Sequence, residues 1–173
     1  MSKVKPYDVI IVGDDAALQF AMEQRDYMFK GIPIVFEGVN SEDLTREALK
    51  DSLITGVVEK LYVENTLDMA LQLIPKAKKV VAVLDDTITG KAERKRYYKV
   101  QEQYPKLEFD EINVSELTTD QLKNSLQKLS KDTILLFVVM TEDADGKQYN
   151  SQQAGEFMLT YASVPAFRMV EAG

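Results

Sequence analysis

Cysteine and histidine are both missing from the 173 residues of this chain. Their absence excludes zinc sites of the usual kind, thiol nucleophiles and Ser-His-Asp catalysis, because each of these needs at least one of the two side chains. A chain without cysteine forms no disulfide, which is compatible with either a cytoplasmic or a cell-surface location. Most hydrolase templates are therefore excluded, whereas the redox compartment stays open.

The sequence also lacks long apolar runs and an excess of positive charge. No run approaches the ~18 to 20 apolar residues that span a bilayer, and the N-terminus does not have the basic-then-apolar layout of a signal peptide. With 28 acidic and 21 basic residues the net charge is −7. Such a surface does not neutralise phosphates, so we expect no nucleic-acid partner. Neither GxGxxG nor GxxxxGKS/T occurs, and no motif therefore supports nucleotide binding.

What the sequence does contain is a regular alternation of apolar runs and amphipathic stretches. Apolar, β-branched runs predict strands at 8–12, 32–36, 80–84, 107–112, 133–140 and 164–170, with a β-type connection at 53–59. Amphipathic stretches predict helices at about 16–29, 41–49, 65–74, 90–104, 119–129 and 151–162. Strands separated by helices imply right-handed crossovers and parallel sheets. The predicted fold class is therefore α/β.

Residue spacing also indicates which side chains lie inside. The run 8–12 is nearly all apolar, as expected of a strand covered on both faces. Within the helices, apolar residues three and four positions apart predict one buried stripe each. The helical residues expected to face the core are Leu18, Phe20, Ala21, Met22, Leu67, Ala70, Leu71 and Ile74. The basic residues between 91 and 99 are interpreted as a solvated helix face.

Two segments share one layout, in which an apolar run is followed by two aspartates and the start of a helix. Asp14 and Asp15 follow the first strand, and Asp85 and Asp86 follow the run 80–84. One interpretation is structural, because aspartate caps helices and offsets their dipole. The other is that one aspartate of each pair caps the helix while its neighbour faces a cleft and binds a ligand. The residues alone leave both open.

Three other interpretations of the acidic residues have less support. A response-regulator receiver needs a further aspartate after the strand 32–36, and the residue there is Glu37. The loop 141–147 spaces its acids somewhat like a calcium loop, but no glutamate closes it at the twelfth position, so a solvated turn with Asp145 and Gly146 at its tip is favoured. An enzyme that uses its carboxylates with magnesium, for instance in phosphoryl transfer, stays an alternative.

Several segments, taken in order, carry a resemblance to a known family. They are residues 6–17, 31–40, 54–57, 73–75, 80–89 and 143–147, which together extend over nearly the whole chain. As a set they resemble the tryptophan/tyrosine-type substrate-binding proteins of ABC transporters and the related extracellular sensor domains of bacterial histidine kinases and diguanylate cyclases. The sensor branch is the more similar, on the segments 12–17 and 143–147.

The resemblance implies a type I periplasmic-binding-protein-like fold, with parallel sheets flanked by helices in two lobes that close on a small molecule. Residues 1–57 would form lobe one and residues 58–173 lobe two. Members of the family begin with further βα units and return to lobe one at the end, so we expect a fragment with lobe one incomplete. An incomplete lobe has an exposed sheet edge, which a second copy, giving a homodimer, or rearranged segments would cover.

The resemblance also implies a set of ligand-binding residues and a function. The ligand-binding residues, carried over by position, are Asp14, Asp15, Ala16, Gly38 and Asn40 in lobe one, and Asp86, Thr87, Thr89, Met140 and Thr141 in lobe two. We expect the two aspartate pairs to face each other across the cleft, with no catalytic residue, no metal ligand and no cofactor.

The expected function is that of an extracytoplasmic small-molecule sensor. The ligand would be an amino acid or a related metabolite, and closure on it would signal to the rest of a membrane-anchored parent, such as a sensor histidine kinase or a diguanylate cyclase. The domain would lie at the extracellular or periplasmic face of the cell membrane. The alternative is a solute-binding protein of an ABC importer.

Overall fold

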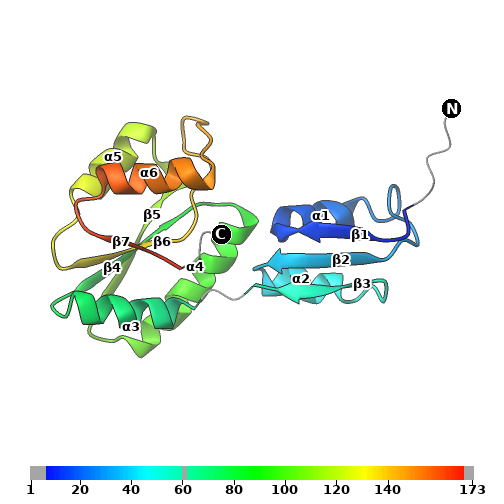
Figure 1. Cartoon of the computed structure of the whole chain (residues 1–173), viewed down its shortest axis with the longest axis horizontal. Helices are drawn as coiled ribbons and strands as arrows, with labels where there is room; N and C mark the ends of the chain where they lie inside the picture. The colour runs from blue at the N-terminus through cyan, green and yellow to red at the C-terminus, as the bar shows by residue number, and fades with distance from the viewer. Residues whose placement is uncertain (1–6, 60–61, 170–173) are drawn as a thin grey trace. The chain divides into compact units, whose positions relative to one another are not determined.

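The computed structural model describes residues 7–59 and 62–169, and the chain divides into two compact units, Met1–Lys60 (unit 1) and Leu61–Gly173 (unit 2). Each unit contains one β-sheet, in which all paired strands are parallel, with helices packed against it (Figure 1). The predicted α/β class is therefore confirmed. The lobes expected from the resemblance divide after residue 57, and the units divide after residue 60.

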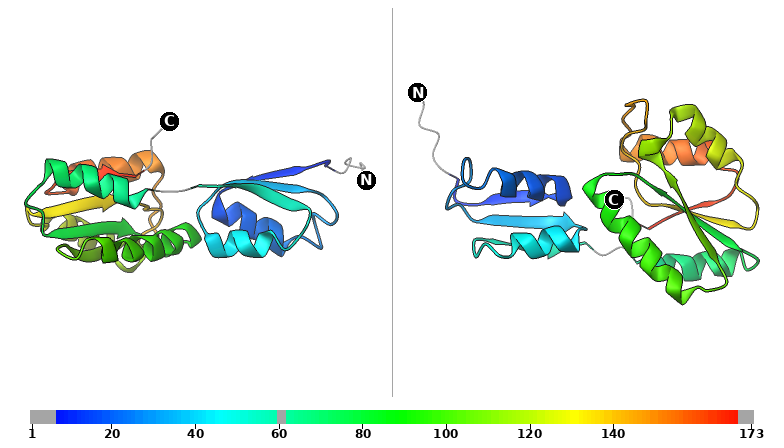
Figure 2. Two further views of the ribbon diagram at one scale, coloured as in Figure 1. Left: turned by 90° about the horizontal axis from the view of Figure 1, so that it is seen from below. Right: turned by 180° about the vertical axis from the view of Figure 1, so that it is seen from behind.

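Unit 1 alternates strands and helices. Its elements are β1 (Ile10–Gly13), α1 (Asp14–Glu23), β2 (Ile34–Val39), α2 (Glu42–Ala48) and β3 (Ile54–Val58). The strands lie side by side in the order β1-β2-β3. Because both crossovers run in the same direction along the sheet and are right-handed, both helices lie on one face of it (Figure 2). The core between this face and the helices includes Leu18, Ala21, Ile34, Phe36, Val39 and Ile54.

Phe36 is buried in this core and explains a glycine in β3. Its side chain is 1% exposed, and the residue lies opposite Gly56 in the sheet. A β-carbon on Gly56 would collide with the carbonyl oxygen and the ring of Phe36. Gly56 therefore marks a close approach of side chain and backbone, which only glycine permits.

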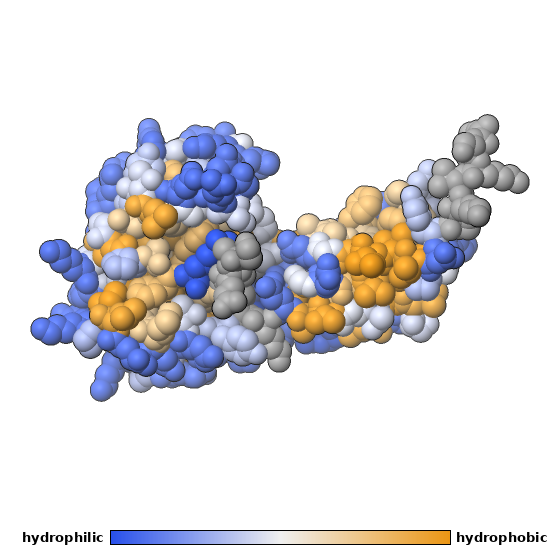
Figure 3. All heavy atoms as spheres, in the orientation of Figure 1, coloured by the Kyte–Doolittle hydropathy of each residue, from blue (hydrophilic) through white to orange (hydrophobic). Residues whose placement is uncertain are grey.

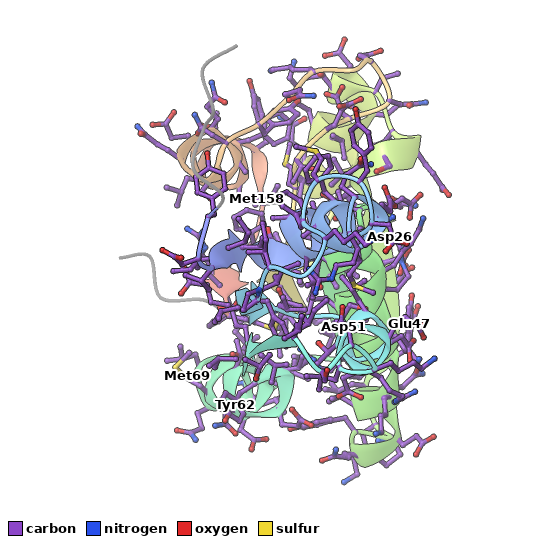
Figure 4. All side chains as sticks on the ribbon, turned by 90° about the vertical axis from the view of Figure 1, so that its right-hand side faces the viewer. Asp26, Glu47, Asp51, Tyr62, Met69 and Met158 are labelled. Atoms are coloured by element: carbon purple, nitrogen blue, oxygen red, sulfur yellow. The ribbon has the colours of Figure 1, made fainter. Side chains whose placement is uncertain are left out.

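Arg25 links the segment that follows α1 to the segment that follows α2. Its Nε lies 2.7 Å from Oδ2 of Asp51, and its guanidinium also donates to the carbonyl oxygens of Phe29 and Ile32. Asp51, labelled in Figure 4, follows α2 in the chain, so the ion pair links the segment after α1 to the segment after α2.

Unit 2 is a sheet with helices on both faces. Its strands are β4 (Lys79–Leu84), β5 (Glu108–Asn113), β6 (Thr133–Phe137) and β7 (Ala166–Arg168), in the spatial order β5-β4-β6-β7. Its helices are α3 (Val63–Leu73), α4 (Ile88–Val100), η1 (Gln101–Gln103), η2 (Val114–Glu116), α5 (Thr119–Gln127) and α6 (Ser151–Tyr161). The side chains of Tyr62, just before α3, and Met69, within it, are exposed (Figure 4).

The central strand β4 shows how the two layers of unit 2 are built. Val80, Ala82 and Leu84 belong to the apolar cluster of α3 and α4, whereas Val81 and Val83 belong to the cluster of α5 and α6. All five are buried. The uninterrupted apolar run is thus what a strand covered on both faces requires.

Several predicted boundaries are wrong for local reasons. The helix expected over 16–29 begins at Asp14 and ends at Glu23, and Phe20, expected in the core, is 51% exposed. The strand expected over 133–140 ends at Phe137, because the next two N–H groups both donate to the carbonyl of Val83. Segment 53–59, expected as a connection between lobes, contains β3 of unit 1.

Candidate functional site

The carboxyl ends of β4 and β6 are joined by one buried carboxylate, that of Asp85. Its Oδ1 accepts from the N–H and the hydroxyl of Thr87, at 3.1 and 2.5 Å. Its Oδ2 accepts from the N–H and the hydroxyl of Thr141, at 3.1 and 2.8 Å. Asp85 itself is 0% exposed. The loops that follow two neighbouring strands are therefore fixed to each other by a side chain that is not accessible to a ligand.

This link lies at the topological switch point of unit 2. The connection after β4 leads to β5 on one side of it, whereas the connection after β6 leads to β7 on the other side. In open α/β sheets ligands bind outside the carboxyl ends of the strands at such a point, because the two connections leave the sheet in opposite directions. Thr87 and Thr141 are exposed there, beside the buried Asp85.

Asp86, the neighbour of Asp85, is accessible and charged. Its side chain is 39% exposed, and it accepts from Nη1 of Arg94 at 2.8 Å and from Nδ2 of Asn113 at 3.2 Å. The hydrogen bond from Asn113, together with the Arg94 guanidinium, outweighs burial and holds the pKa of Asp86 below its usual value. Asp86 is therefore a carboxylate at neutral pH, held in place by two side chains.

The structure corrects two interpretations of this region. The residue that caps α4 is Thr87, whose hydroxyl accepts from the N–H of Gly90 at 3.0 Å, and neither aspartate does so. The basic stretch 91–99 is not only a solvated face. Arg94 also binds Glu111 at 3.0 Å, and Arg96 binds the buried Glu93 at 2.6 Å.

The other two residues predicted in lobe two have different surroundings. Thr89 lies in the first turn of α4 and is partly buried. Met140 is 4% exposed and belongs to the apolar cluster of α5 and α6. Its position after β6 follows the prediction, but its side chain is part of the core.

Unit 1 contains a related link after its first strand. Asp15 is 0% exposed, and its carboxylate accepts from the N–H of Ser41 at 2.9 Å and of Asn40 at 3.4 Å. Asn40 is itself buried and donates to Glu59 at 3.5 Å. In both units a buried aspartate after a strand therefore holds the loop that follows the neighbouring strand.

Asp14 is the exposed member of the pair in unit 1. It has φ 75°, the one positive value at a non-glycine residue in the described part of the chain, and its Oδ1 accepts from the N–H of Asp15 at 2.6 Å. Aspartate tolerates this conformation because its short side chain bonds to the local backbone. Gly38 lies close by, since a β-carbon there would be 3.9 Å from the nitrogen of Asp14.

These contacts show which predicted residues are brought together. Asp14, Asp15, Gly38 and Asn40 gather at the carboxyl edge of the sheet of unit 1, and the exposed Ala16 follows them in α1. The N-cap position of α1 is occupied by Gly13, and no side-chain hydrogen bond caps the helix there. Neither aspartate of this pair is therefore the N-cap residue. The expectation that the two pairs face each other concerns both units and stays a prediction.

Sequence reasoning missed a third buried aspartate, Asp143. The loop 141–147 does turn at the exposed Asp145 and Gly146, the latter with φ 75°. Asp143 is only 4% exposed, however, and accepts from the hydroxyls of Thr119 at 2.5 Å and Tyr149 at 2.7 Å. The spacing Asp-x-Asp-Gly was the available signal, because an aspartate can accept from N–H groups a few residues on, as Asp143 does.

Asp143 makes stability depend on pH. Burial raises the pKa of Asp143, but hydrogen bonds from Thr119, Tyr149 and two backbone N–H groups outweigh it and leave the pKa below its usual value. A lowered pKa in the folded state means that the stabilisation is present above the unfolded pKa of ~3.9 and is lost as the pH falls through the folded pKa. We therefore expect Asp143→Asn to be less stable than the parent by about 1–3 kcal/mol at neutral pH. This difference in stability should disappear as the pH falls from the unfolded pKa of Asp143 through its folded pKa.

Urea unfolding from pH 7 to pH 2 measures this gap. The matched control is Asp26→Asn, which makes the same change of charge at an exposed aspartate of unit 1 (Figure 4) and should follow the parent. A gap for Asp143→Asn that is constant with pH would contradict the expected role of the ionised carboxylate.

Residues 7–59 and 62–169 contain no group of three or more Asp and Glu side chains arranged to hold a metal ion. None of the helices in these ranges combines the length and the apolar composition needed to cross a membrane. Comparisons of the chain with protein-family models, with curated proteins and with solved structures found no match.

Proposed function

We propose that this chain is the small-molecule-sensing part of a bacterial membrane receptor of the histidine-kinase type, located at the extracellular or periplasmic face of the membrane. It has no chemistry of its own in this role. The proposal includes a type I periplasmic-binding-protein-like arrangement, in which ligand binding favours a closed form. A ligand shifts such an equilibrium only by its differential affinity for the two forms.

The observation that supports a ligand site is the construction of the switch point in unit 2. Asp85 fixes the loops after β4 and β6, while Asp86, Thr87 and Thr141 stay accessible beside it. Fixed loops with accessible polar groups reduce the entropy lost when a ligand binds. The buried Asp15 organises the carboxyl edge of unit 1 in the same way.

The accessible groups favour a ligand with an amine, because they are mainly hydrogen-bond acceptors. Asp86 offers a carboxylate to an ammonium group, and its partner Arg94 is also bound to Glu111, so two carboxylates surround one guanidinium. The hydroxyl protons of Thr87 and Thr141 are donated to Asp85, so toward a ligand these oxygens act as acceptors. A free amino acid carries such an ammonium group, and we take it as the ligand class.

Isothermal titration calorimetry of the 173-residue chain with each common L-amino acid in turn tests the proposal. We expect at least one binder, with the dissociation constant raised at least ~10-fold in Asp86→Asn because the charge-assisted contact to the ammonium group is lost. The control is Asp120→Asn, which removes the same charge from an exposed residue of α5 that pairs with Lys123, and it should bind as the parent does. Absence of binding heat for every amino acid, or equal losses in the two variants, would contradict the proposal.

A solute-binding protein of an ABC importer uses the same kind of ligand site and is the second candidate. Gene organisation separates the two. A kinase or cyclase domain encoded in the same polypeptide supports sensing, whereas a permease and an ATPase encoded beside the chain support import.

A further inference from the structure

One face of the sheet in unit 1 carries apolar side chains that neither α1 nor α2 covers. Burial alternates along the first part of β2, where Ile34 and Phe36 face the helices, and Val35 and Glu37 face the other way. We call this other side the open face. It consists of Val9, Ile11, Val35, Glu37, Thr55 and Val57, of which Ile11, Val35 and Thr55 lie in register across the three strands.

The open face is strongly exposed for a parallel sheet. Ile11 and Val57 are each 69% exposed, and Val9 is 44% exposed. Hydrophobic side chains gather there in Figure 3. Parallel sheets occur almost only with both faces covered. Both crossovers of unit 1 run over the opposite face, so α1 and α2 cannot supply the missing layer (Figure 2).

Charge on the open face is restricted to one end. Glu37 is its one ionisable side chain, and it lies beside Gly13 at the carboxyl end of the strands. If two such faces stack with their strands antiparallel, each Glu37 lies over the amino end of the other sheet. The two carboxylates are then separated by roughly the length of a five-residue strand, ~16 Å, which exceeds the Debye length of ~8 Å at physiological salt.

The area of the face predicts how tightly two copies would associate. Three strands ~4.8 Å apart and about five residues long give a flat area of roughly 14 by 16 Å per copy. Two such faces together cover roughly 450 Å², far below the ~1,600 Å² of a standard interface, so a complex through them is weak and transient. The weakest interfaces of standard size have dissociation constants of about 1 μM. Because the open face is smaller, we expect a dissociation constant above about 1 μM.

We propose that the open face is the interface between two copies of this chain, stacked sheet on sheet with their strands antiparallel in a weak twofold dimer. In such an interface each residue of the patch is used twice, once from each copy. One substitution therefore changes two positions of the dimer.

Analytical ultracentrifugation of the whole chain tests the proposal. We expect the weight-average mass to rise from the monomer value of 19.6 kDa toward twice that value as the concentration increases from about 10 μM to about 1 mM. Ile11→Lys should raise the dissociation constant at least ~10-fold, because it places two desolvated like charges in the interface. Ile11 is 69% exposed, so circular dichroism of this variant should match that of the parent.

The matched control is Leu159→Lys, which introduces the same charge at a leucine of α6 that is 86% exposed and lies in unit 2. It should associate as the parent does. A parent that stays monomeric at about 1 mM would overturn the proposal. So would a dimer that Ile11→Lys leaves unchanged, as pairing through the edges of β1 or β3 predicts, or one that both variants weaken equally.

Discussion

Asp85→Asn is expected to lower the free energy of unfolding of unit 2 by about 1.5–3 kcal/mol, the range for hydrogen bonds to a charged group. The carboxylate accepts from two backbone N–H groups, those of Thr87 and Thr141, through different oxygens. An amide keeps one acceptor oxygen and replaces the other by an NH₂ donor. A threonine hydroxyl can rotate to accept from this donor, but the adjacent backbone N–H cannot, so it stays buried without an acceptor.

Urea unfolding followed by circular dichroism measures this loss, and residue-resolved amide exchange assigns it to β4 and β6. The matched control is Asp86→Asn, whose partner Arg94 has a second carboxylate and whose side chain is 39% exposed. We expect that variant to lose less than about 1 kcal/mol, as solvent-exposed ion pairs do. The reverse order of the two variants would show that Asp85 does not hold the loops together.

Gly90→Ala is expected to destabilise unit 2 by about 1–3 kcal/mol, although alanine is the better helix former. Gly90 lies in the first turn of α4, where a β-carbon would collide with the carbonyl oxygen and Oδ1 of Asp85. The helix can accept the methyl group only by moving away from the strand end that it follows. Such a movement also disturbs the contacts that Asp85 makes with both loops.

The control for this prediction is Gly155→Ala in α6. A β-carbon there has no atom within 4 Å, so helix propensity acts alone and should add up to about 1 kcal/mol of stability. The two Gly→Ala substitutions are thus expected to have opposite signs in the same urea experiment. If both stabilise, the contact between α4 and Asp85 is not tight. In the double variant Asp85→Asn, Gly90→Ala the losses should not add, because both act on one contact.

Local sequence patterns are sufficient to predict the helices and strands, but not the hydrogen bonds that join the loops between them. The run 80–84 predicted a fully covered strand, and β4 is one, since its alternate residues pack against opposite helix layers. The role of Asp85 depends on Thr141, which lies 56 residues further along the chain. No short-range spacing carries that information, so the residues alone left helix capping and ligand binding both open.

The run 8–12 shows the opposite case. Its apolar sequence predicted a strand covered on both faces, yet Ile11 is 69% exposed in unit 1. Val35 and Thr55 lie beside Ile11 in the two neighbouring strands, so the same uncovered face extends across all three strands. The pattern indicates the environment for which a strand is suited, and unit 1 provides that environment on one face of the sheet only.

The carboxylate of Asp85 also has a mechanical consequence. Thr87 begins α4 and Thr141 begins the turn that returns through Tyr149 to α6, so one side chain couples the starts of two helix connections on opposite sides of the sheet. A molecule that displaces either threonine must stretch the bonds to the other. The two loops, and the helix layers that they lead to, are therefore joined at this edge of unit 2 by one buried carboxylate.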